Sequence, residues 1–345
     1  MNDCPDIRFP AEWEPQSGVQ LTWPHEDTDW RDLLDEVIPC YAAIARAIAA
    51  RERLLIVCRD ADAVCRQLGD TARLESIRFR EIPSNDTWAR DHGALSVFAG
   101  GQPMLYDFTF NGWGLKFAAN LDNQITRHLV RQNAFAPNVR CRNLQHLVFE
   151  GGGIESDGQG TLLTTEACLL SPNRNDHFTK EELDAFYRQL FGAARILWLR
   201  HGYLAGDDTD SHVDTLARFC SPDAIAYVAC DDADDEHVDA LARMEEELRA
   251  FRTRDGRPYT LIALPMADPV FDGGQRLPAT YANFLIVNGA VLMPTYGSPK
   301  DEAARARLQA AFPGREVVGL DCLPLIKQHG SLHCVTMQYP EGFLL

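Results

Sequence analysis

The sequence predicts an α/β fold in which about five similar units close into a ring. Helical spacing of apolar residues alternates along the chain with short apolar strands, which is typical of α/β proteins. The order helix, strand, polar loop and hairpin recurs at intervals of roughly 60–70 residues, and equal spacing of such units favours a closed repeat architecture. No linker or low-complexity stretch interrupts residues 1–345, so we expect one domain.

The first third of the chain alternates helices and strands. Residues 32–51 have helical spacing with one polar face, although Pro39 should kink or interrupt the first half of this helix. Residues 60–68 form a second, short helix. The expected strands are 19–23, 53–58, 77–82, 94–99 and 104–110, and a polar loop at 85–91 precedes the last two.

The same order continues to the end of the chain. Thr179 and Glu182 form a capping-box pattern, which starts a helix that ends near residue 190. Asn288-Gly289 is a typical hairpin turn, and Pro299 suits the first position of a helix that ends near residue 314. Further helices are expected at 119–132 and 235–252, and further strands at 147–150, 161–165, 196–200, 259–264, 283–295, 316–320 and 334–338.

Composition excludes several classes of protein. The net charge of -17 disfavours nucleic acid and anionic membranes as partners and favours small cations. No apolar run reaches the length of a membrane span, and the first residues lack the features of a signal peptide. The ten cysteines include no C-x-x-C pair, so we expect free thiols and a cytoplasmic location.

The acidic stretch 206–214 holds four aspartates and one histidine, and it should pass from a loop into a strand. On a strand, Asp210, His212 and Asp214 would share one face, which would set a proton-transfer group beside carboxylates that attract a cation. A solvated acidic turn is one alternative. A divalent metal bound by these residues and Asp208 is another, although the spacing does not match a calcium-binding loop.

Three further loops carry residues suited to chemistry. In 88–91, the ring of Trp88 and the carboxylate of Asp91 could together hold a cation, or they could be a core tryptophan and a surface ion pair. Glu150 precedes three glycines, which is typical either of a buried acid with closely approaching backbone or of a simple turn. Cys334 follows a glycine-containing loop, and it would be a nucleophile only as a thiolate.

Together these motifs resemble the agmatine deiminase family, which is related to the bacterial peptidyl-arginine deiminases of the guanidino-group-modifying superfamily. The resemblance extends over essentially the whole chain. It rests on seven segments in the same order: 9–15 (FPAEWEP), 85–93 (NDTWARDHG), 110–116 (FNGWGLK), 150–155 (EGGGIE), 206–214 (GDDTDSHVD), 283–289 (NFLIVNG) and 333–336 (HCVT).

The resemblance implies a five-bladed α/β propeller with pseudo-fivefold symmetry (the pentein type). It also implies hydrolysis of a guanidinium group to a ureido group and ammonia, without metal or organic cofactor. The roles that it implies are a Cys334 nucleophile, His212 as acid and base, and Glu150 as the carboxylate that orients His212. Asp91 and Asp214 would bind the guanidinium group.

The expected substrate is a small cationic guanidine. Agmatine ends in an ammonium group, so its pocket should supply acid and no arginine clamp, and Asp208 is a candidate ligand for that end. We therefore expect conversion of agmatine to N-carbamoylputrescine, a step in putrescine biosynthesis. The alternatives are deimination of peptidyl-arginine or free arginine, a catalytically inactive guanidinium-binding protein, and a metallohydrolase centred on 207–214.

The chain departs from the family pattern before the nucleophile, where Lys327-Gln-His-Gly330 replaces a run of glycines. This loop should border the pocket entrance and affect access or tail preference. A homodimer is expected from the resemblance alone.

Overall fold

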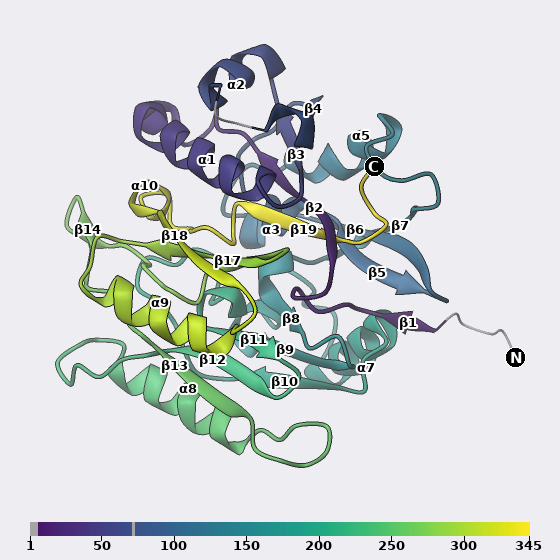
Figure 1. The fold of residues 1–345 in the computed structure, drawn as a ribbon. Helices are drawn as coiled ribbons and strands as arrows, with labels where there is room; N and C mark the ends of the chain where they lie inside the picture. Colours follow the sequence, from purple (N-terminus) through teal and green to yellow (C-terminus); the bar gives the residue numbers. More distant parts are fainter. Residues whose placement is uncertain (1–5, 71–72) are drawn as a thin grey trace, which may run out of the picture.

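The computed structural model describes residues 6–70 and 73–345 (Figure 1). In that part of the chain, the strands form five separate sheets of three or four strands and one two-stranded hairpin. Each of the five sheets contains an antiparallel pair of strands followed by a strand that runs parallel to the second. The α/β fold of recurring units is therefore confirmed, whereas the five-bladed propeller stays a prediction.

One sheet joins the two ends of the chain. Its central strands β2 (Gln16–Thr22) and β3 (Arg53–Cys58) are parallel, and helix α1 (Leu34–Ala49) connects them. The last strand, β19 (Thr336–Pro340), pairs antiparallel with β2, and β4 (Ile77–Glu81) pairs parallel with β3. The last strand of the chain thereby lies in the same sheet as β2, near the start of the chain.

In each of the other four sheets, a helix connects the two parallel strands. The second sheet contains β5 (Leu95–Ala99), β6 (Gln102–Thr109), helix α5 (Ile125–Arg131) and β7 (Arg140–Val148), with β1 (Ile7–Arg8) at its edge. The third contains β8 (Ile154–Ser156), β9 (Thr161–Thr165), α7 (Lys180–Phe191) and β10 (Arg195–Leu199). The fourth contains β11 (Ala217–Ser221), β12 (Ala224–Ala229), α8 (Val238–Ala250) and β13 (Thr260–Pro265). The fifth contains β16 (Leu285–Val287), β17 (Ala290–Thr295), α9 (Lys300–Ala311) and β18 (Glu316–Asp321).

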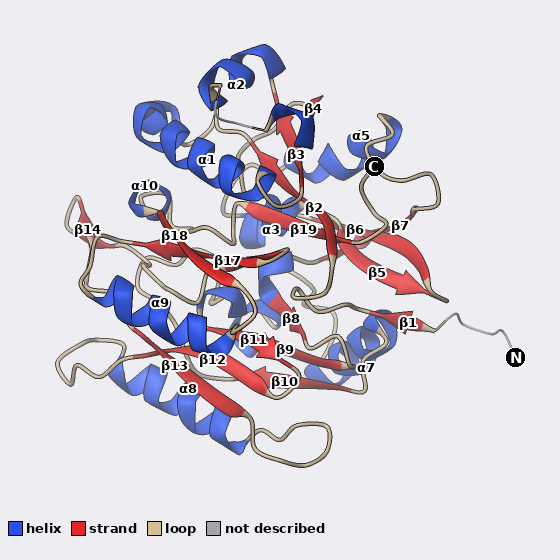
Figure 2. Cartoon of the chain, in the orientation of Figure 1, coloured by secondary structure: helices blue, strands red, loops and turns tan. Residues whose placement is uncertain are grey.

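The longer helices lie around the outside and the strands lie within (Figure 2). This arrangement follows from the sequence, since strands such as β2 and β9 are buried along their whole length and the helices bury only one face. Short elements complete the chain: α2 (Ala61–Leu68), α3 (Ala89–His92), α4 (Gly112–Leu115), α6 (Glu166–Leu169), α10 (Leu323–Ile326), β14 (Phe271–Asp272), β15 (Gln275–Arg276) and five 3₁₀ turns at 31–33, 74–76, 122–124, 151–153 and 213–215.

Two local predictions are wrong. Helix α1 runs through Pro39 without interruption, because this proline is only the sixth residue of a helix that buries a long apolar face. Residues 212–214 do not enter a strand: Val213–Thr215 is a 3₁₀ turn that His212 precedes, and β11 begins only at Ala217.

The connections from one sheet to the next carry the motif residues. Asp91 follows β4, Glu150 follows β7, and His212 and Asp214 follow β10. Asn283 follows β13, and Cys334 follows β18. The prediction that the polar loops occupy corresponding places in successive units is therefore confirmed.

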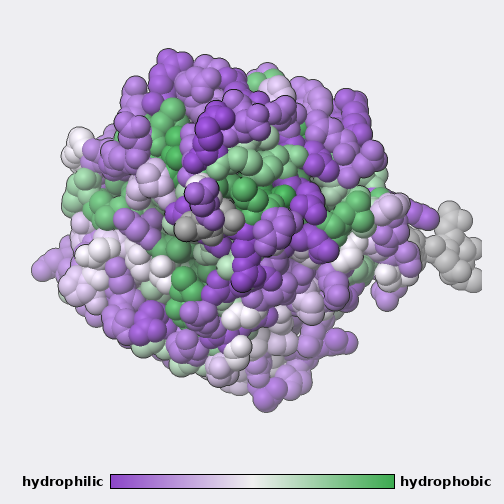
Figure 3. Space-filling view, turned by 45° about the horizontal axis from the view of Figure 1, so that its top comes forward, coloured by the Kyte–Doolittle hydropathy of each residue, from purple (hydrophilic) through white to green (hydrophobic). Residues whose placement is uncertain are grey.

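The surface reflects the acidic composition. Figure 3 shows a face that is mostly hydrophilic, with hydrophobic side chains gathered near its middle. Among the described residues, no helix combines the length and the apolar character that crossing a membrane requires.

Candidate active site

A cavity opens beside Cys334. Two aromatic side chains in its wall, Trp88 and Trp113, pack edge to face with ring centroids 6.3 Å apart. Of the residues that the structure describes, four aspartates line the cavity and no lysine or arginine does. The full lining is Asp29, Asp86, Trp88, Asp91, Trp113, Phe117, Asp208, Thr209, Gln328, His329, Gly330 and Cys334.

Asp91 is held rigidly at the inner end of this cavity. Its Oδ2 accepts a hydrogen bond of 2.9 Å from Trp113 Nε1, and its Oδ1 accepts one of 3.0 Å from the backbone nitrogen of Gly152. Burial raises the pKa of Asp91 to about 6, and nearby carboxylates add to this effect while His212 opposes it. A carboxylate that is costly to ionise in a dry site is stabilised when a cation binds.

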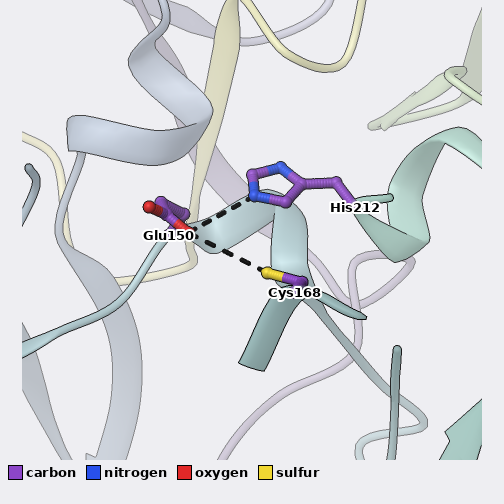
Figure 4. Close-up of side chains that lie close together, drawn as sticks. All are labelled: Glu150, Cys168 and His212. Carbon is purple, nitrogen blue, oxygen red and sulfur yellow. Dashed lines mark hydrogen bonds and ion pairs between the residues drawn. The ribbon is translucent and has the colours of Figure 1, made fainter. Parts of the chain in front are cut away.

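His212 is fully buried between two carboxylates. Its Nε2 lies 3.4 Å from Glu150 Oε2 (Figure 4), and its Nδ1 lies 3.5 Å from Asp91 Oδ1. Burial alone would lower the pKa of His212, but Asp91 and Glu150, with the nearby Cys168, raise it well above its usual value. His212 is therefore an imidazolium at neutral pH.

Glu150 is in turn held by a buried arginine. Arg174 Nε donates a hydrogen bond of 2.6 Å to Glu150 Oε2, and its Nη1 lies 2.6 Å from Asp210 Oδ2. Burial opposes ionisation of Glu150, but His212 and Arg174 together lower its pKa below the usual range. Asp210 binds Arg174 and Lys116 with its carboxylate. It therefore does not share a face with His212 and Asp214, in contrast to the prediction from the sequence.

Gly152 marks a point on which three reactive atoms converge. A Cβ atom at Gly152 would lie 2.5 Å from His212 Nδ1, 2.9 Å from Asp91 Oδ1 and 3.2 Å from Asp214 Oδ1. Neither His212 Nδ1 nor Asp214 Oδ1 has a hydrogen-bond partner within the described parts of the chain. Buried polar atoms without partners are rare, so Asp214 Oδ1 is suited to accept a hydrogen bond from a ligand N–H group, whereas the protonated Nδ1 of His212 is suited to donate one.

Cys334 lies next to this point. Its Sγ is 4.0 Å from Asp214 Oδ2 and 3.4 Å from Asn283 Oδ1. Burial raises the pKa of the Cys334 thiol well above its usual value, and the carboxylates of Asp214 and Asp91 raise it further. All nine cysteines in the described residues are free thiols; Cys4 lies outside them.

Two more carboxylates face the outer part of the cavity. Burial raises the pKa of Asp86 to about 7, and its Oδ1 has no hydrogen-bond partner in residues 6–70 and 73–345. Burial also raises the pKa of Asp208, whose Oδ2 lies 3.9 Å from His329 Nδ1. His329, from the loop that departs from the family pattern, donates a 2.8 Å hydrogen bond from Nδ1 to the carbonyl of Gly206.

The structure brings all the predicted site residues together, but at two depths. Trp88, Asp91, Asp208 and Cys334 line the cavity, whereas Glu150, His212 and Asp214 are buried side chains that contact Asp91, Cys334 or one another. Sequence reasoning missed Asp86, Trp113, Asn283 and His333 as site residues. All four lie inside the seven segments that resemble the family, and this position in the sequence could have identified them.

Two groups of side chains could offer ligands to a metal. Glu150, Cys168 and His212 form one, and Glu12, Glu155 and His333 form the other, with ligand atoms within 4.8 Å of one another. Each group already holds an arginine: Arg174 lies 2.6 Å from Glu150 and Arg218 lies 2.7 Å from Glu12. In each group the arginine already balances the negative charge that a metal ion would balance, so neither group fits a metal.

Comparison with known proteins adds to this geometry. Residues 8–340 match the Porphyromonas-type peptidyl-arginine deiminase family. An agmatine deiminase of Pseudomonas aeruginosa (strain LESB58) is 34% identical over 97% of this chain and 95% of its own length. A Porphyromonas gingivalis structure described as a candidate arginine deiminase is 54% identical, with a TM-score of 0.94 over 98% of this chain and 100% of that one. A C. jejuni agmatine deiminase with substrate bound is 34% identical, with a TM-score of 0.91 over 97% of both chains.

Proposed function

The chain belongs to the Porphyromonas-type peptidyl-arginine deiminase family, and from that premise we propose that it hydrolyses agmatine to N-carbamoylputrescine and ammonia. It is a hydrolase of carbon–nitrogen bonds in amidines. The proposal concerns which amidine it takes and how Cys334 attacks it.

One observation carries the choice of agmatine: in the described part of the chain, the residues that line the cavity include four carboxylates and no lysine or arginine. Agmatine has a guanidinium group at one end and an ammonium group at the other, and both need acid partners. Arginine also carries a carboxylate, which such a wall would repel. The inner aspartate, Asp91, suits the guanidinium, and Asp86 and Asp208 suit the ammonium.

The first half of the reaction forms a covalent intermediate. Binding of the cation offsets the carboxylate charges around Cys334, so its thiol loses a proton to solvent and the thiolate adds to the guanidinium carbon. The imidazolium of His212 then donates its Nδ1 proton to one terminal nitrogen, and that carbon–nitrogen bond breaks to release ammonia. An S-alkylthiouronium remains on Cys334.

The second half releases the product. Neutral His212 takes a proton from a water molecule, the resulting hydroxide adds to the thiouronium carbon, and the carbon–sulfur bond breaks. The hydroxyl proton of the product passes to solvent, the neutral ureido product leaves, and the Cys334 thiolate is restored. Glu150, held by Arg174, keeps the Nε2 side of His212 paired throughout, which leaves Nδ1 as the atom that exchanges protons.

Deimination of free arginine is the second candidate, because the P. gingivalis protein described as a candidate arginine deiminase is 54% identical to this chain. The chemistry at Cys334 would be the same. The two candidates differ in the outer cavity, where arginine would require a partner for its carboxylate.

The wider predictions stay proposals. We propose that residues 1–345 form a single catalytic domain, and that the five sheets are the blades of a propeller with pseudo-fivefold symmetry. The shared topology of the sheets and the pairing of β19 with β2 support this arrangement. We further propose a role in putrescine formation in the cytoplasm; a homodimer stays a prediction from the family.

The deciding experiment measures ammonia and ureido product from purified protein given agmatine, arginine and an arginyl peptide separately. We expect turnover of agmatine, with at least a thousandfold loss in Cys334→Ala. Cys58→Ala is the matched control, because Cys58 is a buried free thiol on β3 that does not line the cavity. Turnover of arginine in place of agmatine would overturn the substrate, and no turnover of any guanidine would overturn the function.

Asp208 tests the ammonium end of the cavity. Asp208→Asn should raise KM for agmatine about tenfold while leaving KM for a short alkylguanidine nearly unchanged, because only agmatine has the distal charge. Glu246→Gln removes an exposed carboxylate on α8 and is the control for loss of one negative charge. Equal effects on the two substrates would remove Asp208 from this subsite.

A further inference from the structure

A buried network beneath the site joins four motif residues that the reaction does not use. Arg218 is fully buried, and its Nη2 lies 2.7 Å from Glu12 Oε2 and 3.0 Å from His333 Nε2. Its Nε donates to Glu155, and its Nη1 donates to the carbonyl of Phe284 at 2.6 Å. Segments from the start, middle and end of the chain therefore meet at one guanidinium group.

His333 connects this network to the site. Its Nδ1 lies 2.7 Å from Asp214 Oδ2, and its Nε2 faces both Arg218 and Glu12, the latter at 2.8 Å. The carboxylate of Asp214 can only accept, so His333 carries a proton on Nδ1; a neutral His333 then accepts from Arg218 at Nε2, whereas a charged one donates from Nε2 to Glu12. A charged His333 carries a proton on Nδ1 as well. In both states Nδ1 donates to Asp214.

The two oxygens of Asp214 therefore have different roles. His333 holds Oδ2, whereas Oδ1 has no partner among the described residues and points to the position beside Gly152 where His212 Nδ1 and Asp91 Oδ1 also converge. The backbone is fixed as well, because Asn283 Oδ1 accepts from the backbone nitrogens of His333 and Cys334 at 2.8 and 3.3 Å. Asp214 cannot turn without breaking the bond to His333.

We propose that His333 is a positioning residue, which holds Asp214 by Oδ2 so that Oδ1 is presented to the substrate guanidinium. This inference rests on the proposed function, because it concerns how the guanidinium is bound. Consistent with this role, Asp214 keeps a pKa below its usual range: burial opposes ionisation, but the hydrogen bond from His333 and the neighbouring positive charges outweigh it.

The alternative role for His333 is to complete the Arg218–Glu12 network and so stabilise the fold alone. Two amide substitutions separate the roles. The amide nitrogen of asparagine can occupy the place of Nδ1 and keep a donor for Asp214, whereas the amide of glutamine reaches the place of Nε2 and keeps the contact with Arg218 and Glu12.

The experiment measures KM and kcat for a short alkylguanidine in wild type, His333→Asn and His333→Gln, and Kd for the same ligand in the Cys334→Ala background. We expect His333→Asn to stay within about threefold of wild type, and His333→Gln to raise KM and Kd about tenfold or more, since a hydrogen bond to a charged group is lost. A fold-stabilising role would lower the melting temperature and leave Kd unchanged.

Three outcomes would overturn the inference: the reverse order of the two variants, equal weakening in both, or no weakening in either. If a variant does not fold, a crystal structure of Cys334→Ala with agmatine decides, since Oδ1 must contact the guanidinium while Oδ2 stays on His333. A guanidinium on Oδ2, or on neither oxygen, would overturn it. Inactive wild-type protein would instead refute the proposed function, so the two failures are distinguishable.

Discussion

The carboxylate of Asp91 affects the protonation of both Cys334 and His212. Asp91 and Asp214 raise the pKa of the thiol, and Asp91 also raises that of His212. At neutral pH the free protein therefore holds a protonated thiol beside a protonated imidazole. The acid is ready to protonate a leaving group, but the nucleophile needs the substrate's positive charge before it ionises.

This state predicts that a guanidinium ligand lowers the pKa of Cys334. Titration of the thiolate absorbance, corrected with Cys334→Ala, should give a pKa above the ordinary cysteine range for the free protein and a clearly lower one with a saturating alkylguanidine. The cause is attraction between the bound cation and the thiolate. An unchanged thiol pKa would contradict substrate-assisted ionisation.

Asp91 predicts the acid limb of the pH profile. Its pKa is about 6, and only the ionised carboxylate pairs with a guanidinium, so binding is complete above this pKa and is lost as pH falls through it. For a short alkylguanidine, kcat/KM should fall about tenfold per pH unit below about pH 6. A profile that stays flat down to pH 4 would show that Asp91 does not bind the cation.

At the scale of single elements, helix α7 begins with a complete capping box. Thr179 accepts from the backbone nitrogen of Glu182, and Glu182 returns a hydrogen bond to the backbone nitrogen of Thr179. Both lie at the surface and outside the cavity wall. Local sequence fully accounts for this helix start.

Thr179→Ala should lower the free energy of unfolding by about 1 kcal/mol, because the backbone nitrogen of Glu182 loses its hydrogen-bond acceptor. Urea unfolding checks this value, and Thr179→Ser, which keeps the hydroxyl, should remain near wild type. The activity on agmatine should not change. A loss of activity without a loss of stability would contradict the separation of α7 from the site.

At the scale of the whole molecule, the net charge of -17 should draw a dication toward the cavity. The value of kcat/KM for agmatine should therefore fall several-fold as ionic strength rises from about 0.01 to about 0.15 M, since the Debye length shortens from about 30 to about 8 Å. A singly charged alkylguanidine should respond less. Equal salt slopes for both substrates would mean that the field of the molecule does not steer binding.

The sequence alone determined the units of the fold and the class of chemistry. The Asn288-Gly289 turn, the capping box of α7 and strands such as Arg53–Cys58 follow from interactions between close neighbours in the chain, and the structure confirms them. The seven ordered segments likewise identified the family. The local prediction failed at 212–214, where a 3₁₀ turn replaces the expected strand, because contacts with Asp91, Glu150 and His333 outweigh local strand preference.

Only the tertiary structure decided which residues meet. Asp91, His212 and Asp214 converge beside Gly152, although Asp91 comes from the connection after β4 and the other two from the connection after β10. Arg218 joins Glu12 to His333, which lie 321 positions apart in the chain. No local pattern encodes such contacts, because the packing of whole sheets determines them. The same packing leaves one oxygen of Asp214 bonded to His333 and the other without a partner among the described residues.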